Sequence, residues 1–455
     1  MLDTETCQIK PAGRHFTGSD QRAPLRDGLT NAGQMGPTQT AGRFYPIACV
    51  ALEITQRCNL DCTLCYLSDK AESAFDVPLV VLKRRIQMIY DHYGPGTSVQ
   101  ITGGDPTLRK TTDVAELCRF IRSLGMRSCL MTNGIRAKRE MLAELADAGL
   151  NDVAFHVDLT QERKGFATEA DLNAVRADYI DRAKDLGLRI LFNTTVYDGN
   201  LAQIPDIARF FRDHPEHLTL VSFQLQADTG RGVLRARDDE VSQASVMAAI
   251  SRGIAALIDF DTVRVGHSDC NRYASMVIAG GKAISALGNQ GLVADLIGEL
   301  EHHETRLDGH LDIAPTLWRV IRRKPWLALR AARHMLSLAW QLRRGLVRTK
   351  GRASRLAILV HNFMDGKKLD SERCQSCVFM VATEDGPLSM CAHNAKRDDY
   401  LFQPARVETD GKTQWWSAAT DRMTNKPVHA DAAPTPRKLL KGRMKAAVVK
   451  QTSRT

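Results

Sequence analysis

Between residues 47 and 226 the sequence alternates six short apolar runs with longer amphipathic stretches. The apolar runs are residues 47–55, 98–102, 126–132, 152–159, 188–196 and 218–226, and the helical patterns between them lie around residues 78–93, 113–124, 138–148, 169–186 and 202–213. Such alternation is typical of βα units that form a parallel sheet. Six units are too few for a closed eightfold barrel, so the sequence predicts an α/β fold with an open barrel or a doubly wound sheet.

Polar motifs follow these predicted strands. In either arrangement the carboxyl ends of the strands and the loops after them carry the chemistry. The segment CNLDCTLCY (58–66) follows the first strand, GGDPT (103–107) the second and TNG (132–134) the third. At or near successive strand ends stand Asn133, Asp158, Asn193 and Gln224, which suit hydrogen bonds to a ribose or a carboxylate. Polar residues also cap strand ends in ordinary turns, so a structural role remains open for each.

Three cysteines, Cys58, Cys62 and Cys65, are spaced C-x3-C-x2-C in the first loop. A structural zinc ion takes four ligands, whereas three thiolates on a four-iron cluster leave one iron open. An open position is how a metal site admits a reacting ligand. The spacing therefore indicates a cluster that binds something further. The alternatives are a four-ligand site completed by a distant cysteine, and unrelated core cysteines.

The segment CNLDCTLCY resembles the signature of the radical SAM superfamily, and GGDP (103–106) resembles its GGEP motif with Asp in place of Glu. The two motifs lie about 40 residues apart after consecutive strands, as in that family. The resemblance implies a partial (β/α)6 barrel and a [4Fe–4S] cluster on Cys58, Cys62 and Cys65. It also implies that S-adenosylmethionine chelates the open iron and is cleaved to a 5′-deoxyadenosyl radical that abstracts a substrate hydrogen. A reducing partner such as flavodoxin or ferredoxin is implied as well.

Several residues fit a bound S-adenosylmethionine. Gly103 and Gly104 lack Cβ atoms, so the backbone can approach the methionyl amine closely. Asp105 and Pro106 complete the motif, although a Gly-Gly pair standing alone would indicate only a turn. Tyr66 matches the aromatic position that the family places against adenine; taken alone, an aromatic there is more often part of the core.

A second set of cysteines, Cys374, Cys377 and Cys391, has the spacing C-x2-C-x13-C. Between them VFMVAT and PLSMC flank EDG, which predicts a hairpin that returns Cys391 to the other two. Zinc would take a fourth ligand from His393 or Cys270, and spacing alone fits zinc and iron–sulfur equally. The spacing resembles the C-terminal cluster of the molybdenum-cofactor cyclase that rearranges GTP, which implies an auxiliary [4Fe–4S] cluster. Cys270 is then a fourth ligand or an isolated thiol, and the other cysteines, Cys7, Cys49, Cys118 and Cys129, are predicted to be unligated.

The net charge of +10 is concentrated in two segments. Residues 313–364 contain twelve Lys and Arg and no acid, and residues 425–455 contain eight and one acid. Within residues 314–352 much of an apolar side is made by Trp318, Ile321, Trp326, Leu329, Leu336 and Trp340. Trp and Leu beside Arg, with no acid, are typical of a helix lying in a membrane interface. A packed helix pair broken near Pro325 and a nucleic-acid surface are the alternatives, the latter the least favoured.

A narrower resemblance rests on ALEITQRCNLDCTLCY (51–66), FNTTV (192–196) and HNFMD (361–365) with CVFMVATEDGPLSMCAHN (377–394). These are similar to a radical SAM branch that contains tetraether-lipid synthases and pterin methylases. The resemblance implies attack on an unactivated C–H bond, with a lipid as one substrate, but the rubredoxin-like cysteines of that branch are absent. A peptide or a nucleotide-like substrate is the alternative. A non-catalytic electron carrier or a metal-stapled binding protein is disfavoured, because neither needs the GGDP motif.

These interpretations divide the chain into five parts. We expect a disordered tail (1–44), the partial barrel (45–260), a helical insert with the basic amphipathic segment (261–365), an auxiliary-cluster region (366–405) and a basic tail (406–455). No signal peptide and no run of about 20 apolar residues is evident. Closely spaced cysteines without a secretory signal indicate reduced metal ligands. The sequence thus predicts a cytoplasmic protein, with peripheral contact to the inner face of the membrane through the basic segment.

Overall fold

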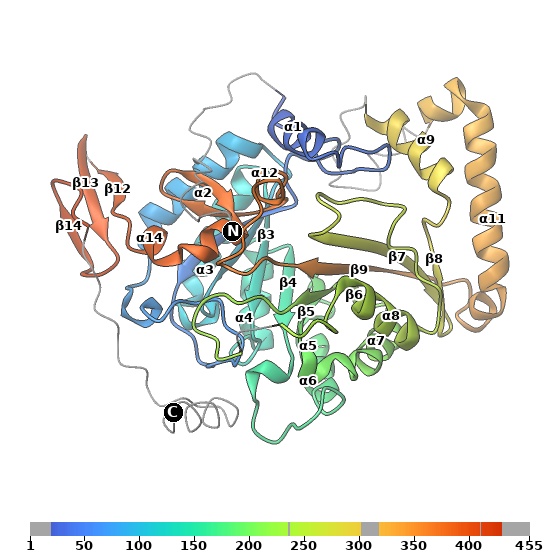
Figure 1. Ribbon diagram of the computed structural model, residues 1–455, viewed down its shortest axis with the longest axis horizontal. Coiled ribbons are helices and arrows are strands. Elements are labelled where there is room, and N and C mark those ends of the chain that lie inside the picture. Colours follow the sequence, from blue (N-terminus) through green and yellow to red (C-terminus); the bar gives the residue numbers. More distant parts are fainter. Residues whose placement is uncertain (1–19, 235–236, 302–317, 410, 430–455) are drawn as a thin grey trace.

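One sheet of 11 strands organises the computed structural model, which describes residues 20–234, 237–301, 318–409 and 411–429 (Figure 1). The strand order is β11-β10-β1-β2-β3-β4-β5-β6-β9-β7-β8. The strands are β1 (Cys49–Thr55), β2 (Ser98–Gly103), β3 (Arg127–Thr132), β4 (Asp152–His156), β5 (Arg189–Val196), β6 (Leu218–Leu225), β7 (Asn271–Ala279), β8 (Lys282–Ser285), β9 (Ser354–Asn362), β10 (Phe379–Thr383) and β11 (Gly386–Ser389). The sheet ends at β11 and β8, so this part of the chain forms an open sheet and not a closed barrel.

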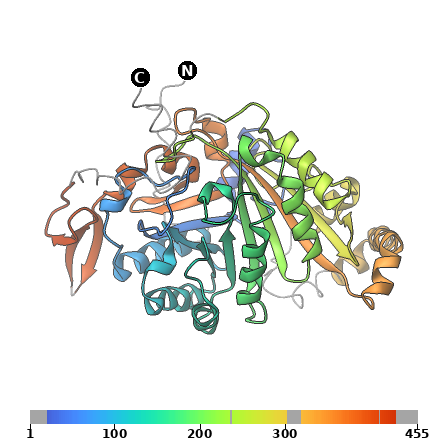
Figure 2. The same ribbon diagram turned by 90° about the horizontal axis from the view of Figure 1, so that it is seen from below.

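The central six strands confirm the predicted βα alternation. Strands β1 to β6 lie side by side in sequence order, and every neighbouring pair is parallel. The helices that alternate with them and follow them are α2 (Leu79–Tyr93), α3 (Thr111–Ser123), α4 (Arg139–Asp147), α5 (Asn173–Ala183), α6 (Asp198–Leu201), α7 (Ile204–Asp213) and α8 (Gln243–Ile254). Strand β1 is buried along its whole length, as expected for a parallel strand covered on both faces. Figure 2 shows the helices along the outer side of the curved sheet.

Both edges of this six-stranded unit are extended by later parts of the chain. Strand β10 pairs in parallel with β1, and β11 returns antiparallel to it, which confirms the hairpin predicted around EDG. At the other edge β9 pairs in parallel with β6, and β7 pairs antiparallel with β9. The expectation of a helical insert over 261–365 was therefore wrong where β7, β8 and β9 lie. Their apolar residues, such as Met276 and Ile358, join the main core because they continue the sheet.

The helical part of that insert lies at the far edge of the sheet. Helix α9 (Gln290–Glu301) packs near α11 (Pro325–Arg348), and a short helical stretch at 318–323 precedes α11. The helix begins at Pro325, as the predicted break there requires. Within the described residues, none of the helices combines the length and apolar character required to cross a membrane.

The two ends of the described chain differ from expectation. Residues 20–44 were expected to be disordered, yet α1 (Ala23–Asn31) buries Leu25 and Leu29 against Val378. Gly28 permits this contact, because a Cβ there would lie 2.5 Å from the carbonyl oxygen of Gln375. Residues 405–424 were assigned mostly to a tail, yet they form a three-stranded sheet of β12 (Ala405–Thr409), β13 (Lys412–Ser417) and β14 (Arg422–Thr424). Residues 1–19 and 430–455 lie outside the described residues.

Short elements surround the inner side of the sheet. They are the 3-10 helices η1 (Ala71–Ser73), η2 (Pro106–Leu108) and η3 (Leu159–Gln161), and the helices α12 (Ser371–Gln375), α13 (Met390–Ala395) and α14 (Arg397–Leu401). Elements η2 and η3 follow β2 and β4 directly, and α12 to α14 flank the β10–β11 hairpin. Together they surround the carboxyl ends of the central strands.

Candidate functional site

A cavity of about 900 Å³ runs along the inner side of the sheet. At the carboxyl ends of the strands it is lined by Gly103, Thr132, Asn133, His156, Asn193 and Thr195. At the opposite ends it is lined by Ser98, Arg127, Asp152 and Arg189. Strand β3 connects Arg127 to Thr132, so the cavity extends over about 20 Å, the length of a six-residue strand.

The loop after β1 brings Cys58, Cys62 and Cys65 to this cavity, where all three line its wall. The backbone N–H of Thr63, between them, donates to the carbonyl of Thr160 at 2.8 Å. From the other side, Gly232 N–H donates to the carbonyl of Cys65 at 3.2 Å. The loop is thus fixed by the end of β4 and by the segment after β6. Burial raises the pKa of the Cys58 thiol to about 11.

The glycines after β2 lie in direct contact with the end of β1. Gly103 has φ +127°, and a Cβ on it would lie 2.0 Å from the Thr55 carbonyl oxygen. A Cβ on Gly104 would lie 2.1 Å from the carbonyl oxygen of Arg57. Only glycine fits both positions, and both line the cavity beside the cysteine loop. This side-chain-free wall, next to three thiols, fits the group that the resemblance implies.

Asp105 and Pro106, also expected at the cofactor, do not line the cavity. The Asp105 carboxylate is fully buried and accepts hydrogen bonds from η2 and from the end of β3. Thr107 donates to it from its N–H at 3.0 Å and its hydroxyl at 2.5 Å, and the Thr132 hydroxyl and Asn133 N–H each donate at 2.9 Å. These hydrogen bonds join the end of β2 to the end of β3. Because protein donors already occupy both carboxylate oxygens, Asp105 has a structural role behind the cavity wall.

Asp158 occupies a similar position after β4 and is likewise absent from the cavity wall. It accepts hydrogen bonds from Thr160 N–H at 3.0 Å and from Thr195 N–H at 2.7 Å, and it pairs with His156 Nε2 at 2.7 Å. Burial opposes the charge of Asp158, but the nearby His156 outweighs it and lowers the pKa to about 2. His156, which the sequence reasoning missed, is the side chain of this pair that faces the cavity.

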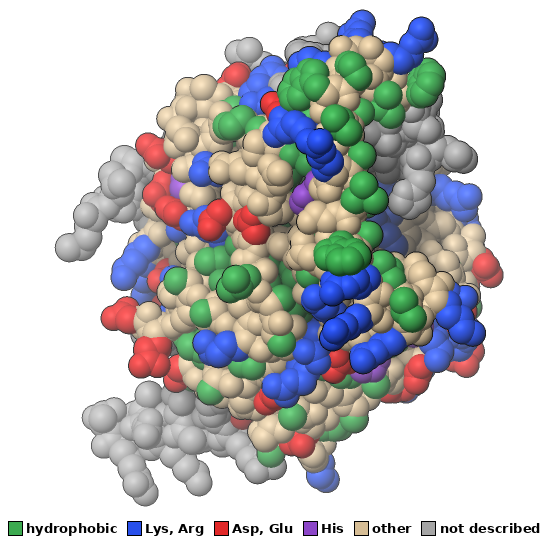
Figure 3. Space-filling view, turned by 90° about the vertical axis from the view of Figure 1, so that its right-hand side faces the viewer, with side chains coloured by type: hydrophobic (Ala, Val, Ile, Leu, Met, Phe, Trp, Pro, Cys, Tyr) green, Lys and Arg blue, Asp and Glu red, His purple; other side chains and the backbone are tan. Residues whose placement is uncertain are grey.

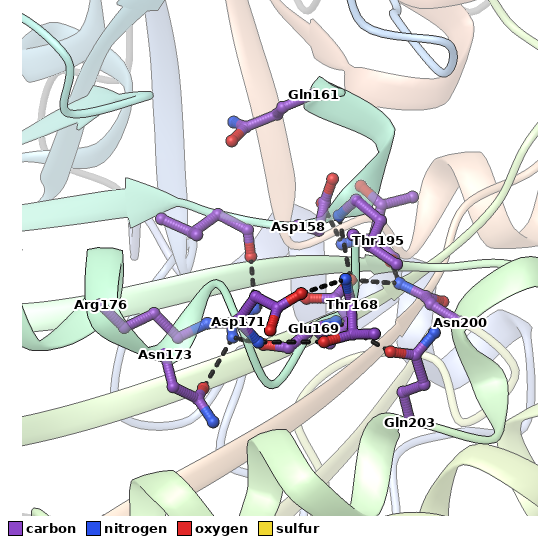
Figure 4. A network of polar contacts seen from close by, with 12 residues as sticks. Asp158, Gln161, Thr168, Glu169, Asp171, Asn173, Arg176, Thr195, Asn200 and Gln203 are labelled. Carbon is purple, nitrogen blue, oxygen red and sulfur yellow. Dashed lines mark hydrogen bonds and ion pairs between the residues drawn. The ribbon is translucent and has the colours of Figure 1, made fainter. Parts of the chain in front are cut away.

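Behind Asp158 lies a buried polar network (Figure 4). Glu169 Oε2 accepts from Arg176 at 2.6 Å, and its Oε1 accepts from Asn200 at 2.8 Å and from the Leu159 N–H at 3.0 Å. Arg176 is fully buried and also donates to the Val157 carbonyl at 3.0 Å. Gln161 points away from this network in Figure 4 and lines the cavity. The network fixes the backbone on both sides of Asp158, so its role is structural.

Asn133, Asn193 and Gln224 lie on the cavity wall. The Asn133 side-chain amide donates to Asn59 Oδ1 at 2.6 Å and lies 4.0 Å from Cys58 Sγ. The Asn193 amide is directed at the sulfur of Met131 at 3.9 Å. The structure therefore brings these three amides into one cavity with the cysteine loop.

Tyr66 also lines the cavity, and it is held from both sides. Its hydroxyl donates to the carbonyl of Gly103, and the guanidinium of Arg397 lies 4.5 Å from its ring centre. Arg397 donates to the backbone carbonyl of Tyr66 at 3.0 Å and to both carboxylate oxygens of Glu53 at 2.6–2.7 Å. No sequence pattern pointed to the pair of Glu53 and Arg397, whose members are 344 positions apart.

The second cysteine set gathers around the β10–β11 hairpin. Cys374 and Cys391 are buried on α12 and α13, and Cys391 lines the cavity. Burial raises the pKa of the Cys391 thiol, and the nearby Cys377, Cys270 and Cys374 raise it further. These four thiols therefore share one neighbourhood. Ten cysteines lie in the described residues, and all ten are free of disulfides.

Of the two candidates for a fourth ligand, Cys270 lies with the set. The Nε of Arg373, next to Cys374, donates to Cys270 Sγ at 3.2 Å. His393 instead stacks on Tyr400, and burial lowers the pKa of its imidazole to about 4. In the described part of the chain no three His, Cys, Asp or Glu side chains converge closely enough to hold a single metal ion. Ligands of a four-iron cluster each bind a different iron.

Comparison with known proteins gives a family match over residues 52–211, to the radical SAM superfamily. The 7,8-dihydro-6-hydroxymethylpterin dimethyltransferase of Methanocaldococcus jannaschii is 27% identical over 186 residues, covering 40% of this chain and 36% of that protein. The Fe-coproporphyrin III synthase of Methanosarcina barkeri is 29% identical, covering 42% and 47%. The GTP 3′,8-cyclase of Aquifex aeolicus is 30% identical, covering 37% and 54%. The chain thus spans between a third and just over half of these relatives.

Solved structures match more weakly. The crystal structure of Streptococcus suis SuiB bound to S-adenosylmethionine is 15% identical, covers 42% of this chain and 44% of that one, and has a TM-score of 0.34. Methylornithine synthase (PylB) is 13% identical, covers 55% and 72%, and has the same TM-score. These superpositions cover only part of each chain. The fold of this protein is therefore described from its own strand order.

Proposed function

The chain carries a radical SAM domain, and from this premise we propose that it is a radical SAM enzyme that acts on an unactivated C–H bond. One observation carries the proposal: three cysteines and a side-chain-free Gly-Gly wall meet at the same end of a large cavity. When bound, a [4Fe–4S] cluster supplies the electron that splits S-adenosylmethionine and thereby yields a hydrogen-abstracting 5′-deoxyadenosyl radical. The rest of the cavity leaves room for a substrate.

In this proposal each residue has a defined task. Cys58, Cys62 and Cys65 hold the cluster, and Gly103 and Gly104 let the methionyl part lie against the backbone. Tyr66 faces the adenine, its ring fixed by Arg397 and by the Gly103 carbonyl. The amides of Asn133, Asn193 and Gln224 bind the ribose and the carboxylate. Asp105 and Asp158 position these groups from behind the wall, because their oxygens already bind protein donors.

We assign the second cysteine set to an auxiliary iron–sulfur cluster. Cys374, Cys377 and Cys391 supply thiolates, and Cys270 is a further thiol close to Cys391. Among the four, Cys391 lines the cavity. A cluster held there faces the same space as the first cysteine loop. Arg373, which donates to Cys270, offers a positive charge beside these thiolates.

The cavity wall supports an amphiphilic substrate, with a lipid as the leading candidate. Its middle section is lined by apolar side chains that include Ala51, Ala154, Leu191, Leu220, Leu359 and Val381. Its far end holds Arg127 and Arg189, which share one carboxylate, Asp152. Two guanidinium groups against one acid leave a positive charge for an anionic head group. An alkyl chain along the apolar walls would then extend about 20 Å towards the cysteine loop.

A peptide or nucleotide-like substrate is the second candidate. Relatives named GTP 3′,8-cyclase and PqqA peptide cyclase support it, each about 30% identical over the domain. The positively charged end of the cavity, at Arg127 and Arg189, would suit a phosphate or a peptide carboxylate as well. The two candidates differ in the apolar middle section, where a nucleotide would leave the walls without a partner.

The proposal is tested on protein purified without air and reconstituted with iron and sulfide. With dithionite or reduced flavodoxin we expect the parent to convert S-adenosylmethionine to 5′-deoxyadenosine. The triple change Cys58→Ala, Cys62→Ala and Cys65→Ala should abolish this product. Cys118→Ala, buried in α3 away from the cavity, is the control and should retain it. Continued formation of 5′-deoxyadenosine by the triple variant would refute the proposal and leave an electron carrier or binding protein as the alternative.

Substrate class is tested by transfer of deuterium. The reconstituted enzyme is incubated separately with perdeuterated membrane lipid, with a perdeuterated cellular peptide fraction and with deuterated nucleotides. We expect deuterium in 5′-deoxyadenosine from the lipid arm. Label arising only from the peptide or nucleotide arm would overturn the lipid assignment and leave the radical chemistry intact.

A further inference from the structure

Helix α11 has two apolar faces, and one of them packs on the protein. Leu338 and Leu342 are buried against Ala279 of β7 and Ile284 of β8. Gly345 lies so close to this sheet that a Cβ there would be 2.0 Å from the Ala279 carbonyl oxygen. This face accounts for the folding of the helix onto the edge of the sheet.

The other apolar face is turned away from the protein. Leu329, Leu336, Trp340 and Val347 follow one another at spacings of seven, four and seven residues, so they form one stripe along the helix. Both Leu336 and Trp340 are 69% exposed, and Val347 is 81% exposed. Just before the stripe, Trp318, Ile321 and Trp326 are exposed as well. We call Leu329, Leu336, Trp340 and Val347 the outer stripe.

Arginines flank the outer stripe on both sides. Arg333, Arg343 and Arg344 lie within one turn of its members and are exposed. The guanidinium of Arg343 lies 4.4 Å from the ring centre of Trp340. Figure 3 shows this face, with hydrophobic and basic side chains next to each other over α11. Two acids on the facing helix α9 are already engaged, since Asp295 pairs with Arg330 and Glu299 with Lys324.

We propose that the outer stripe and its flanking arginines form a docking surface for an anionic phospholipid membrane. Exposed Trp and Leu insert between lipid acyl chains, while Arg reaches the phosphate head groups from the same helix. A protein partner would need a complementary acidic rim, and a nucleic acid would leave the Trp and Leu side chains without an apolar partner. The inference goes beyond the proposed reaction, because it concerns where the protein resides.

The apolar part is tested by flotation of the full chain with vesicles. The parent should float with phosphatidylcholine vesicles that contain 30% phosphatidylglycerol. The double change Leu336→Ser and Trp340→Ser should lower the partition coefficient at least about tenfold, since both side chains leave the acyl region. Leu257→Ser is the matched control: Leu257 is 95% exposed but lies outside α11, so binding should not change. Thermal unfolding should not change either, because neither stripe residue packs on the fold.

The charged part is tested on the same vesicles. Changing Arg333, Arg343 and Arg344 to Gln should weaken binding about fivefold per residue at low salt and reduce its salt dependence. Arg209→Gln, an exposed arginine on α7, should leave binding unchanged. With purely phosphatidylcholine vesicles the parent and the triple variant should bind alike.

Two outcomes would overturn this inference. One is a parent that does not float with anionic vesicles; the other is a double variant that floats like the parent. Binding to duplex DNA or RNA with a steep salt dependence and no flotation would assign the surface to nucleic acid instead. Formation of 5′-deoxyadenosine is measured on every variant and should be unchanged. Loss of flotation with retained cleavage therefore tests the docking surface alone, separately from the proposed function.

Discussion

Two buried aspartates repeat one local arrangement at the edge of the site. Asp105 and Asp158 each accept hydrogen bonds from the N–H and the hydroxyl of a threonine two residues later, at 3.0 and 2.5 Å. Each then binds a neighbouring strand end, through Asn133 N–H in one case and Thr195 N–H in the other. Through these hydrogen bonds, both carboxylates fix neighbouring strand ends of the cavity wall relative to each other.

Asp158 should make stability depend on pH. Its folded pKa of about 2 lies below the ordinary value of 3.8, so its contribution is complete above about pH 4 and is lost as the pH falls through 2. The shift corresponds to about 2 kcal/mol of unfolding free energy. Urea unfolding of the cluster-free chain should show Asp158→Asn less stable by about this amount at pH 6 and no different near pH 2. An equal loss at both pH values would contradict the assignment, and the exposed Asp206→Asn should follow the parent throughout.

Gly103 should not tolerate a side chain. In Gly103→Ala the new Cβ meets the Thr55 carbonyl at 2.0 Å, so the ends of β1 and β2 must separate. Gly187→Ala is the matched control, with φ +72° and nothing within 4 Å. Both changes introduce a side chain at positive φ, which costs about 1 kcal/mol. Only Gly103→Ala should also lose S-adenosylmethionine binding in calorimetry, and equal behaviour of the two variants would argue against the close-approach role.

At the scale of elements, the β10–β11 hairpin connects the second cysteine set to the central six strands of the sheet. Strand β10 pairs with β1, the strand that precedes the first cysteine loop. The helices on either side of the hairpin carry Cys374 and Cys391. Through this pairing a segment over 300 residues downstream becomes part of the same cavity wall.

Cys374→Ala should separate the two cysteine sets. The parent, purified without air, should hold about eight irons per chain, and the variant about half of that. Reductive formation of 5′-deoxyadenosine should persist, because the first cysteine loop is untouched, while substrate turnover should fall. Cys129→Ala, a buried cysteine in β3 outside the second set, should retain the full iron content. Stoichiometric zinc in the anaerobically purified parent would replace the iron–sulfur assignment.

For the whole molecule, one buried ion pair joins the first strand to the last helix of the site. Glu53 of β1 and Arg397 of α14 form a bidentate pair, and Gln56 donates to Glu53 at 2.8 Å. Burial alone would raise the pKa of Glu53, but the charge of Arg397 and the hydrogen bonds from Arg397 and Gln56 together outweigh burial and hold the pKa below its ordinary value. Arg397 also donates to the Tyr66 carbonyl and lies over the Tyr66 ring. The C-terminal helix α14 therefore holds Tyr66 in position at the cavity wall.

Removing Arg397 should therefore be costly. Arg397→Gln leaves the Glu53 carboxylate buried without its partner, for which about 3–5 kcal/mol of unfolding free energy is expected. Adding Glu53→Gln should recover part of the loss, because no unpaired charge remains. Arg406→Gln is the control: its pair with Glu408 is more than half exposed and should contribute under about 1 kcal/mol. The two single variants are compared by urea unfolding, and a similar small loss in both would show that the buried pair is not essential.

The sequence by itself determined the features that depend on neighbouring residues. The six βα units, the hairpin around EDG and the positions of both cysteine sets follow from local periodicity and turn residues, and the strand order confirms the fold. Only the tertiary structure decided which polar side chain at a strand end faces the cavity. At the end of β4 it is His156 and not Asp158, because the sequence alone allows either residue to point inward. It also decided the Glu53–Arg397 pair, the edge strands β7 to β9 and the packing of α1, since these contacts join distant segments. The same reason applies to α11, where two apolar faces look alike in sequence and only contact with β7 and β8 shows which one remains exposed.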